Sequence, residues 1–159
     1  MPHINLIAKI YNMKRHPSLI HLSREHHGAL ILARLLQKNA PPYKDLPADV
    51  AGKASYAIKF YKEELIKHFQ EEEKALQLVK EVNAQLSLLV QIIFKEHEEL
   101  HAAFKFINNH PDIESHLDEL GKALEIHVRK EERELFPLIQ ESCSEELMTA
   151  IDTSLSPPL

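Results

Sequence analysis

Phe94-Lys95-Glu96-His97-Glu98-Glu99-Leu100-His101 is the most informative stretch of this chain, because it places two histidines on the apolar face of a long helix. On both sides of it, apolar side chains recur at the spacing of one helix face. They are Leu86, Val90, Ile93, Phe104 and Ile107. His97 and His101 fall on that face, where leucines would be expected. Two inward-facing imidazoles one turn apart suit a transition metal.

Length and composition indicate one mostly helical domain. The chain has 159 residues, of which 44% are apolar and 27% charged, and it has only 3 Gly. The net charge of −5, with dispersed basic residues, argues against nucleic acid or an anionic membrane as a partner. The single Cys143 excludes an intrachain disulfide and a Cys-rich metal site. Because signal-peptide and membrane-length apolar runs are lacking, we expect a cytoplasmic protein.

The same helical pattern recurs in other segments. We expect helices at about 17–38, 48–80 and 84–107, and a fourth helix that follows Pro111 and is kinked or shortened by Pro137. Short connections between amphipathic helices predict an all-α fold. Its expected architecture is an up-down-up-down antiparallel four-helix bundle.

The chain divides into three predicted parts. Residues 1–15 form an N-terminal extension, residues 16–141 form the bundle, and residues 142–159 form a small C-terminal helix and a tail. We expect Ser142 and Glu145 to begin that helix as a capping box.

Each predicted bundle helix carries an inward-facing histidine, and two carry a glutamate as well. The His-x3-Glu spacing of the second helix recurs in the fourth, as in a weak two-fold repeat. The residues expected to converge are His26, His68, Glu72, His97, His101, His127 and Glu131. Without a compensating cation, burying this set would cost more than a domain's typical net stability of roughly 5–15 kcal/mol. We therefore predict bound metal.

The ligand set indicates which metals fit. Imidazole and carboxylate without thiolate suit iron, manganese or zinc. Seven ligands are too many for one tetrahedral ion and suit two ions bridged by carboxylates, for which Glu72 and Glu131 are the natural bridges. Two six-coordinate irons that also share a solvent oxygen would keep one position open for dioxygen, peroxide or nitric oxide.

Four motifs follow one another along the chain. They are Leu22-Ser23-Arg24-Glu25-His26, His68-Phe69-x-x-Glu72, His97-x3-His101, and His127-x3-Glu131-Glu132 followed by Leu135-Phe136-Pro137. In this order they resemble the hemerythrin family, in its bacterial HHE cation-binding branch, over about 14–141. The resemblance implies a four-helix bundle with a non-haem di-iron site that binds dioxygen reversibly. It also implies as ligands His26, His68, Glu72, His97, His101, His127 and one carboxylate of the fourth helix.

That last carboxylate has two candidates. Oxygen carriers of this family have an Asp five residues after the histidine of the fourth helix, a position that is Glu132 here. The helix period instead favours Glu131, about 40° round the helix from His127, over Glu132 at about 140°. The spacing of the second helix agrees, so we predict Glu131.

We predict a non-haem di-iron protein that binds or senses dioxygen or a related small ligand. No additional acid–base pair is evident near the site, which favours a binding protein over an enzyme and assigns no catalytic residue. The alternatives are a di-iron oxidoreductase acting on peroxide or nitric oxide, and an iron storage or sensing protein. A homodimer formed through the N-terminal extension is left open.

Overall fold

The computed structural model describes residues 14–155, and every regular element in that range is helical. The elements are α2 (Pro17–Leu35), α3 (Val50–Phe60), the π-helical turn η1 (Tyr61–Leu65), α4 (Ile66–Val79), α5 (Ala84–Lys105), the 3₁₀ turn η2 (Ile107–Asn109), α6 (Ile113–Lys130), the π-helical turn η3 (Glu131–Leu135), α7 (Phe136–Ser142) and α8 (Glu145–Leu155). Almost all of the predicted N-terminal extension, and the end of the predicted tail, lie outside the described residues.

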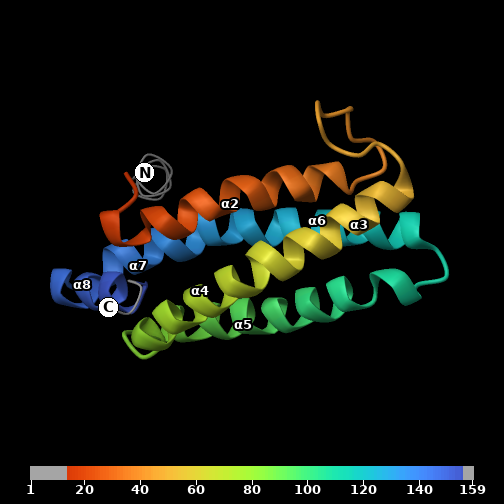
Figure 1. Ribbon diagram of the computed structural model, residues 1–159. Coiled ribbons are helices and arrows are strands. Elements are labelled where there is room, and N and C mark those ends of the chain that lie inside the picture. Colours follow the sequence, from red (N-terminus) through yellow and green to blue (C-terminus); the bar gives the residue numbers. More distant parts are fainter. Residues whose placement is uncertain (1–13, 156–159) are drawn as a thin grey trace, which may run out of the picture.

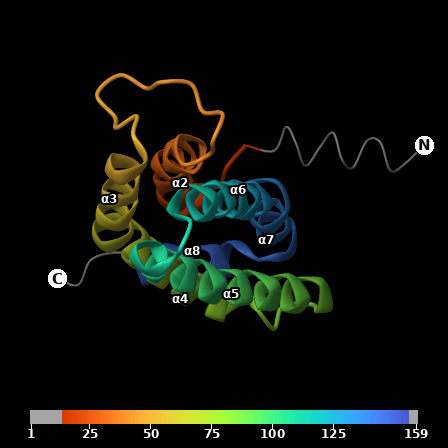
Figure 2. The ribbon, with the colours of Figure 1, turned by 90° about the vertical axis from the view of Figure 1, so that its right-hand side faces the viewer.

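The long helices lie alongside one another as a helical bundle. In Figure 1 the chain runs along α2, returns through α3 and α4, runs out again along α5 and returns through α6 and α7. Figure 2 looks along the bundle and shows α2 beside α6, with α4 and α5 on the opposite side. α8 contacts α4 and α2 at one end of the bundle. No helix among residues 14–155 is long and apolar enough to cross a membrane.

Side-chain caps fix several helix starts. The side chains of Asp49, Asn83 and Asp112 each accept a hydrogen bond from a backbone N–H three residues later. The predicted capping box at Ser142 is wrong, because Ser142 is the last residue of α7. The hydroxyl of Ser144 instead accepts from the N–H of Leu147 at 3.2 Å.

Two π-helical turns interrupt the helices that carry the His-x3-Glu pairs. η1 ends shortly before His68, whereas η3 begins at Glu131 itself. The helix also continues through Pro137 to Ser142. Pro137 has no N–H for the carbonyl of Arg133, which lies inside η3, so the π-helical turn accommodates the proline.

The apolar core has two parts, separated by a polar layer. One cluster includes Leu32, Phe69 and Phe104, and the other includes Leu22 and Ile93. The buried histidines and glutamates of the described residues lie between them. They are His26, His68, Glu72, His97, His127 and Glu131. The helices thus bring polar side chains to one depth, with apolar packing above and below.

Candidate metal centre

The polar layer is sealed from solvent. The four histidines on α2, α4, α5 and α6 are between 1% and 3% exposed, and Glu72 and Glu131 are 0% exposed. Burying an ionised carboxylate is costly unless a cation or several hydrogen-bond donors face it. The two glutamates must therefore be compensated by what surrounds them.

The layer consists of two groups of ligand atoms that share both glutamates. His26 and His68 form one group with Glu72 and Glu131, and His97 and His127 form the other with the same two residues. Within each group, the ligand atoms lie within 4.8 Å of one another. Each glutamate therefore faces both histidine pairs, as a carboxylate bridge between two ions would.

The shortest contacts pair Nε2 of each histidine with a shared carboxylate. His127 Nε2 lies 2.9 Å from Glu131 Oε1, and His97 Nε2 lies 3.0 Å from Glu72 Oε1. His68 Nε2 lies 3.2 Å from Glu72 Oε2, whereas His26 Nε2 lies 3.4 Å from an oxygen of each glutamate. All four Nε2 atoms therefore point toward the same interior space.

Several of these buried atoms have no hydrogen-bond partner. They are Nε2 of His26, His68 and His127, Oε2 of Glu72, and both carboxylate oxygens of Glu131. Buried polar atoms are rarely left unpaired, and here the unpaired ones are all metal-ligand types. Nitrogen and carboxylate oxygen without sulfur suit iron, manganese or zinc. The residues present thus fit a pair of metal ions.

Each of the four histidines is held from outside by a second glutamate, on a neighbouring helical stretch. The Nδ1–carboxylate distances are 2.7 Å for His26–Glu132, 3.0 Å for His68–Glu25, 2.8 Å for His97–Glu73 and 2.8 Å for His127–Glu96. Each outer glutamate is also the sequence neighbour of a buried Glu or His on its own helix. Together the four pairs form a closed circuit round the bundle, which we call the outer glutamate ring (Glu25, Glu73, Glu96 and Glu132).

The outer glutamate ring fixes which nitrogen faces inward. An ionised carboxylate can only accept hydrogen bonds, so each imidazole donates its Nδ1–H outward. Its Nε2 is then the nitrogen available to a metal, and a carboxylate on the far side of the ring makes that nitrogen more basic. The six residues of the buried layer were expected from the sequence to converge, whereas this ring was missed. The sequence feature that could have revealed the ring is a glutamate directly next to a buried candidate ligand on each helix.

In the metal-free protein, protons on the histidines stabilise the layer. Burial by itself lowers the pKa of His26, but the hydrogen bond with Glu132 and the nearby carboxylate of Glu72 outweigh burial and raise that pKa to about 9. The pKa of His97 is raised by the same competition. Burial raises the pKa of Glu72, but the three histidines that face its carboxylate outweigh burial and hold the pKa well below its usual range. Metal ions and protons therefore compete for the same nitrogens.

The two carboxylates proposed for the fourth helix have different positions. Glu131 belongs to both ligand groups. Glu132 lies outside the layer, where it accepts hydrogen bonds from Arg15 at 2.9 Å and Ser23 at 3.2 Å besides its contact with His26. The structure thus places Glu131 where the helix period expected it, and Glu132 among the outer partners.

His101 belongs to neither ligand group. Its Nδ1 lies 2.6 Å from the hydroxyl of Tyr61, and its ring stands edge-on to Phe69 with the centroids 5.2 Å apart. Burial and the neighbouring His97 lower the pKa of His101, so the imidazole is neutral near pH 7. Its role as a metal ligand stays a prediction.

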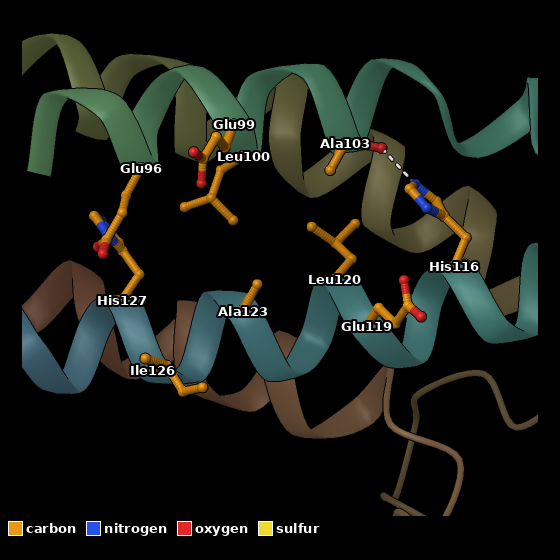
Figure 3. A pocket seen from close by; sticks show the side chains of 10 residues that line it. All are labelled: Glu96, Glu99, Leu100, Ala103, His116, Glu119, Leu120, Ala123, Ile126 and His127. Atoms are coloured by element: carbon orange, nitrogen blue, oxygen red, sulfur yellow. Dashed lines mark hydrogen bonds and ion pairs between the residues drawn. The ribbon is translucent and has the colours of Figure 1, made fainter. Parts of the chain in front are cut away.

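A groove of about 410 Å³ between α5 and α6 reaches the outer edge of the layer (Figure 3). Glu96 and His127 line one end of it, and His116 lies at the other end, with Nε2 2.8 Å from the carbonyl oxygen of Ala103. Ala103 and Ala123 leave the space between the helices open. The groove therefore opens to solvent beside the outer side of His127, one of the candidate ligands.

Comparison with known proteins gives one match. The chain has no match among curated proteins or among solved structures. The hemerythrin HHE cation binding domain matches residues 19–139, which span the whole polar layer and most of the bundle. Hemerythrin domains are helical bundles that bind metal, in agreement with the buried His/Glu groups. The chain therefore belongs to the hemerythrin HHE cation-binding family.

Proposed function

We propose that this protein binds two iron ions in the polar layer of an up-down-up-down four-helix bundle and uses them to bind or sense dioxygen or a related small ligand. The observation that carries the proposal is the pair of histidine groups that share two fully buried glutamates. Family membership supports metal binding, and the thiolate-free ligand set supports iron. Manganese and zinc fit the same ligands and are distinguished by metal analysis.

The proposed ligand roles follow from the two groups. His26 and His68 would hold one ion, His97 and His127 would hold the other, and the two buried glutamates would bridge them. His101 would be the fifth imidazole. When bound, the iron pair supplies a redox-active centre to which a small molecule can coordinate.

Two phenylalanines restrict water around the layer. Phe69 stacks on His97 with the centroids 4.4 Å apart, and it also contacts His68 and His127. Phe136 stacks on His26 at 5.6 Å. Apolar contacts of this kind keep solvent from the metal ligands and favour reversible binding over irreversible oxidation.

The test is optical. Ferrous iron is added to the metal-free protein without oxygen, and air is then admitted. We expect two irons per chain and a visible charge-transfer band that disappears on deoxygenation. Irreversible oxidation without such a band would overturn reversible dioxygen binding.

The same preparation distinguishes the alternatives. Catalytic consumption of peroxide or nitric oxide by the iron-loaded protein would identify an oxidoreductase. A rise in melting temperature on metal loading, with no spectral response to any of these ligands, would identify a storage or sensing protein.

A further inference from the structure

Arg15 lies outside the stretch that matches the family, and yet it reaches the edge of the candidate centre. The match covers residues 19–139, whereas Arg15 precedes α2. Its guanidinium extends to the π-helical turn η3, where it contacts Glu132, the outer partner of His26. The family's pattern by itself therefore does not reveal this residue.

The π-helical turn takes the usual helical donor away from the backbone carbonyl of Glu132. In an α-helix this carbonyl would accept from the N–H of Phe136, but that N–H donates to the carbonyl of Glu131 instead. The next residue is Pro137, which has no N–H. Nη2 of Arg15 supplies the hydrogen bond, at 2.8 Å from the carbonyl oxygen of Glu132. A side chain from before α2 thus completes the turn that carries the candidate ligand Glu131.

The same guanidinium nitrogen also holds the side chain of Glu132. Nη2 of Arg15 lies 2.9 Å from Oε2, and the hydroxyl of Ser23 donates to that oxygen at 3.2 Å. The other oxygen, Oε1, lies 2.7 Å from Nδ1 of His26. Hydrogen bonds between charged groups are stronger than those between neutral ones. One cation therefore fixes both the backbone and the carboxylate of Glu132.

Arg15 is itself held in place. Its Nη1 donates to Oε1 of Gln140 at 3.2 Å, and the same oxygen accepts from the backbone N–H of His16 at 3.0 Å. The guanidinium also lies 5.3 Å from the centroid of the Phe136 ring, which stacks on His26. Arg15 thus contacts both of the side chains, a carboxylate and an aromatic ring, that adjoin the imidazole of His26 from outside.

We propose that Arg15 is a positioning residue for the metal ion that His26 and His68 would hold. By fixing Glu132, it keeps the imidazole of His26 in the orientation in which Nε2 faces the two buried glutamates at 3.4 Å. Without Arg15, the carboxylate of Glu132, which is 25% exposed, can turn toward solvent, and the imidazole then loses its outer hydrogen bond. The inference rests on the proposed di-metal function and assigns part of its binding strength to a residue outside the matched stretch.

Titration with cobalt(II) in competition with a chelator tests this role. Arg15→Gln removes the charge and the forked donor, and we expect it to weaken one of the two binding steps by about threefold to tenfold. That step should be the one that Glu132→Gln weakens, whereas the other step should stay within about twofold. Arg133→Gln, an exposed change in the same π-helical turn, is the matched control and should change neither step.

A double variant shows whether Arg15 acts through Glu132. We expect Arg15→Gln to add little once Glu132 has lost its charge, so the double variant should bind no more than about twofold more weakly than Glu132→Gln. Effects that multiply would mean two independent contributions and would overturn the positioning role. Ser23→Ala removes the other donor to the same oxygen and should weaken the same step, and an effect on the other step would contradict the inference.

The outcomes separate the two proposals. Equal weakening of both steps in Arg15→Gln, or no weakening, would overturn the inference while two ions still bind. Failure of the unaltered protein to bind two metal ions would overturn the proposed function itself, and the metal content shows this before any variant is compared. Circular dichroism of each variant checks that its helical content is retained.

Discussion

The two halves of the candidate centre have the same kinds of inward-facing side chains, but the outer partners of their histidines have different surroundings. Each half offers two histidine Nε2 atoms to the same pair of glutamates. Around His26, the outer partner Glu132 is itself fixed by Arg15 and Ser23. Around His127, the outer partner Glu96 is paired with Lys130 and borders the open groove. His101 belongs to neither half and contacts Tyr61 and Phe69.

The two halves differ in the groups that fix their outer glutamates. Charged hydrogen bonds surround the His26 side and hold its ligands in one arrangement. On the other side, Glu96 pairs with Lys130 beside the groove between α5 and α6, whereas a smaller groove of about 200 Å³ borders Glu25 and His68. We therefore expect a change at an outer glutamate to act mainly on the ion of its own half.

The largest expected effect comes from removing what the halves share. Glu131→Gln removes the negative charge that would bridge both ions, so we expect metal content to fall from two ions per chain to one or none. Elemental analysis of the purified variant measures this. Glu134→Gln, an exposed change within the same π-helical turn, is the matched control and should retain both ions. Two tightly bound ions in Glu131→Gln would rule out the bridging role.

The next effect distinguishes the halves through their outer partners. Glu132→Gln and Glu96→Gln keep a hydrogen-bond acceptor beside the imidazole but remove its charge. We expect each to weaken metal binding by about 10-fold to 100-fold. Each variant should affect mainly the ion on its own side, as measured by competition with a chelator during metal titration. Equal weakening of both ions by both variants would mean that the halves are not separable.

A smaller effect is expected from pH in the metal-free protein. The pKa of His26 is about 9 in the folded chain against a usual value of about 6.5. The stability it contributes is fully present below pH 6.5 and is lost as the pH rises through about 9. The melting temperature of metal-free protein should fall by on the order of 5 °C over that interval.

Thermal melts with a chelator present measure this fall, and His26→Gln should flatten it. Exposed His27→Gln is the control and should leave it unchanged. Metal affinity should change in the opposite sense, because binding releases protons and becomes stronger as the pH rises. A melting temperature that rises from pH 6.5 to 9 in the metal-free protein would contradict the interpretation.

The smallest effect should come from His101→Ala. Because His101 belongs to neither ligand group, its loss should leave both ions bound and weaken binding of the second by no more than about tenfold. His97→Ala is the comparison variant and should lose the second ion, because His97 is locked by Glu73. Metal content and the visible spectrum of the cobalt(II)-loaded protein distinguish the two variants. Equal losses of metal from the two variants would show that His101 contributes as much to metal binding as the histidines held by outer glutamates.

The sequence predicted the all-helical fold and the residues of the polar layer because both depend on periodicity. His127 and Glu131, for example, interrupt an apolar stripe at a spacing that only a common helix face explains. The same periodicity placed Glu131 rather than Glu132 in the layer. A regular helix carries that information along the chain without reference to other helices.

The features that were missed depend on contacts between helices. A π-helical turn locally changes which side chains of the helix face the core. The amino-acid sequence of residues 61–65 does not predict such a turn. The contact of Tyr61 with His101 follows from that register and from the packing of α5. The first helix also ends at Leu35 rather than near 38, because Asn39 and the prolines after it define the loop only loosely.

The outer glutamate ring has a consequence for how the bundle assembles. Each long helical stretch both contributes inward-facing side chains and steadies an imidazole of its neighbour, so every member of the circuit depends on another. A helix that rotates or slides would disturb the protein on two sides at once. Loading of the centre should therefore slow backbone amide exchange throughout the bundle together, rather than helix by helix.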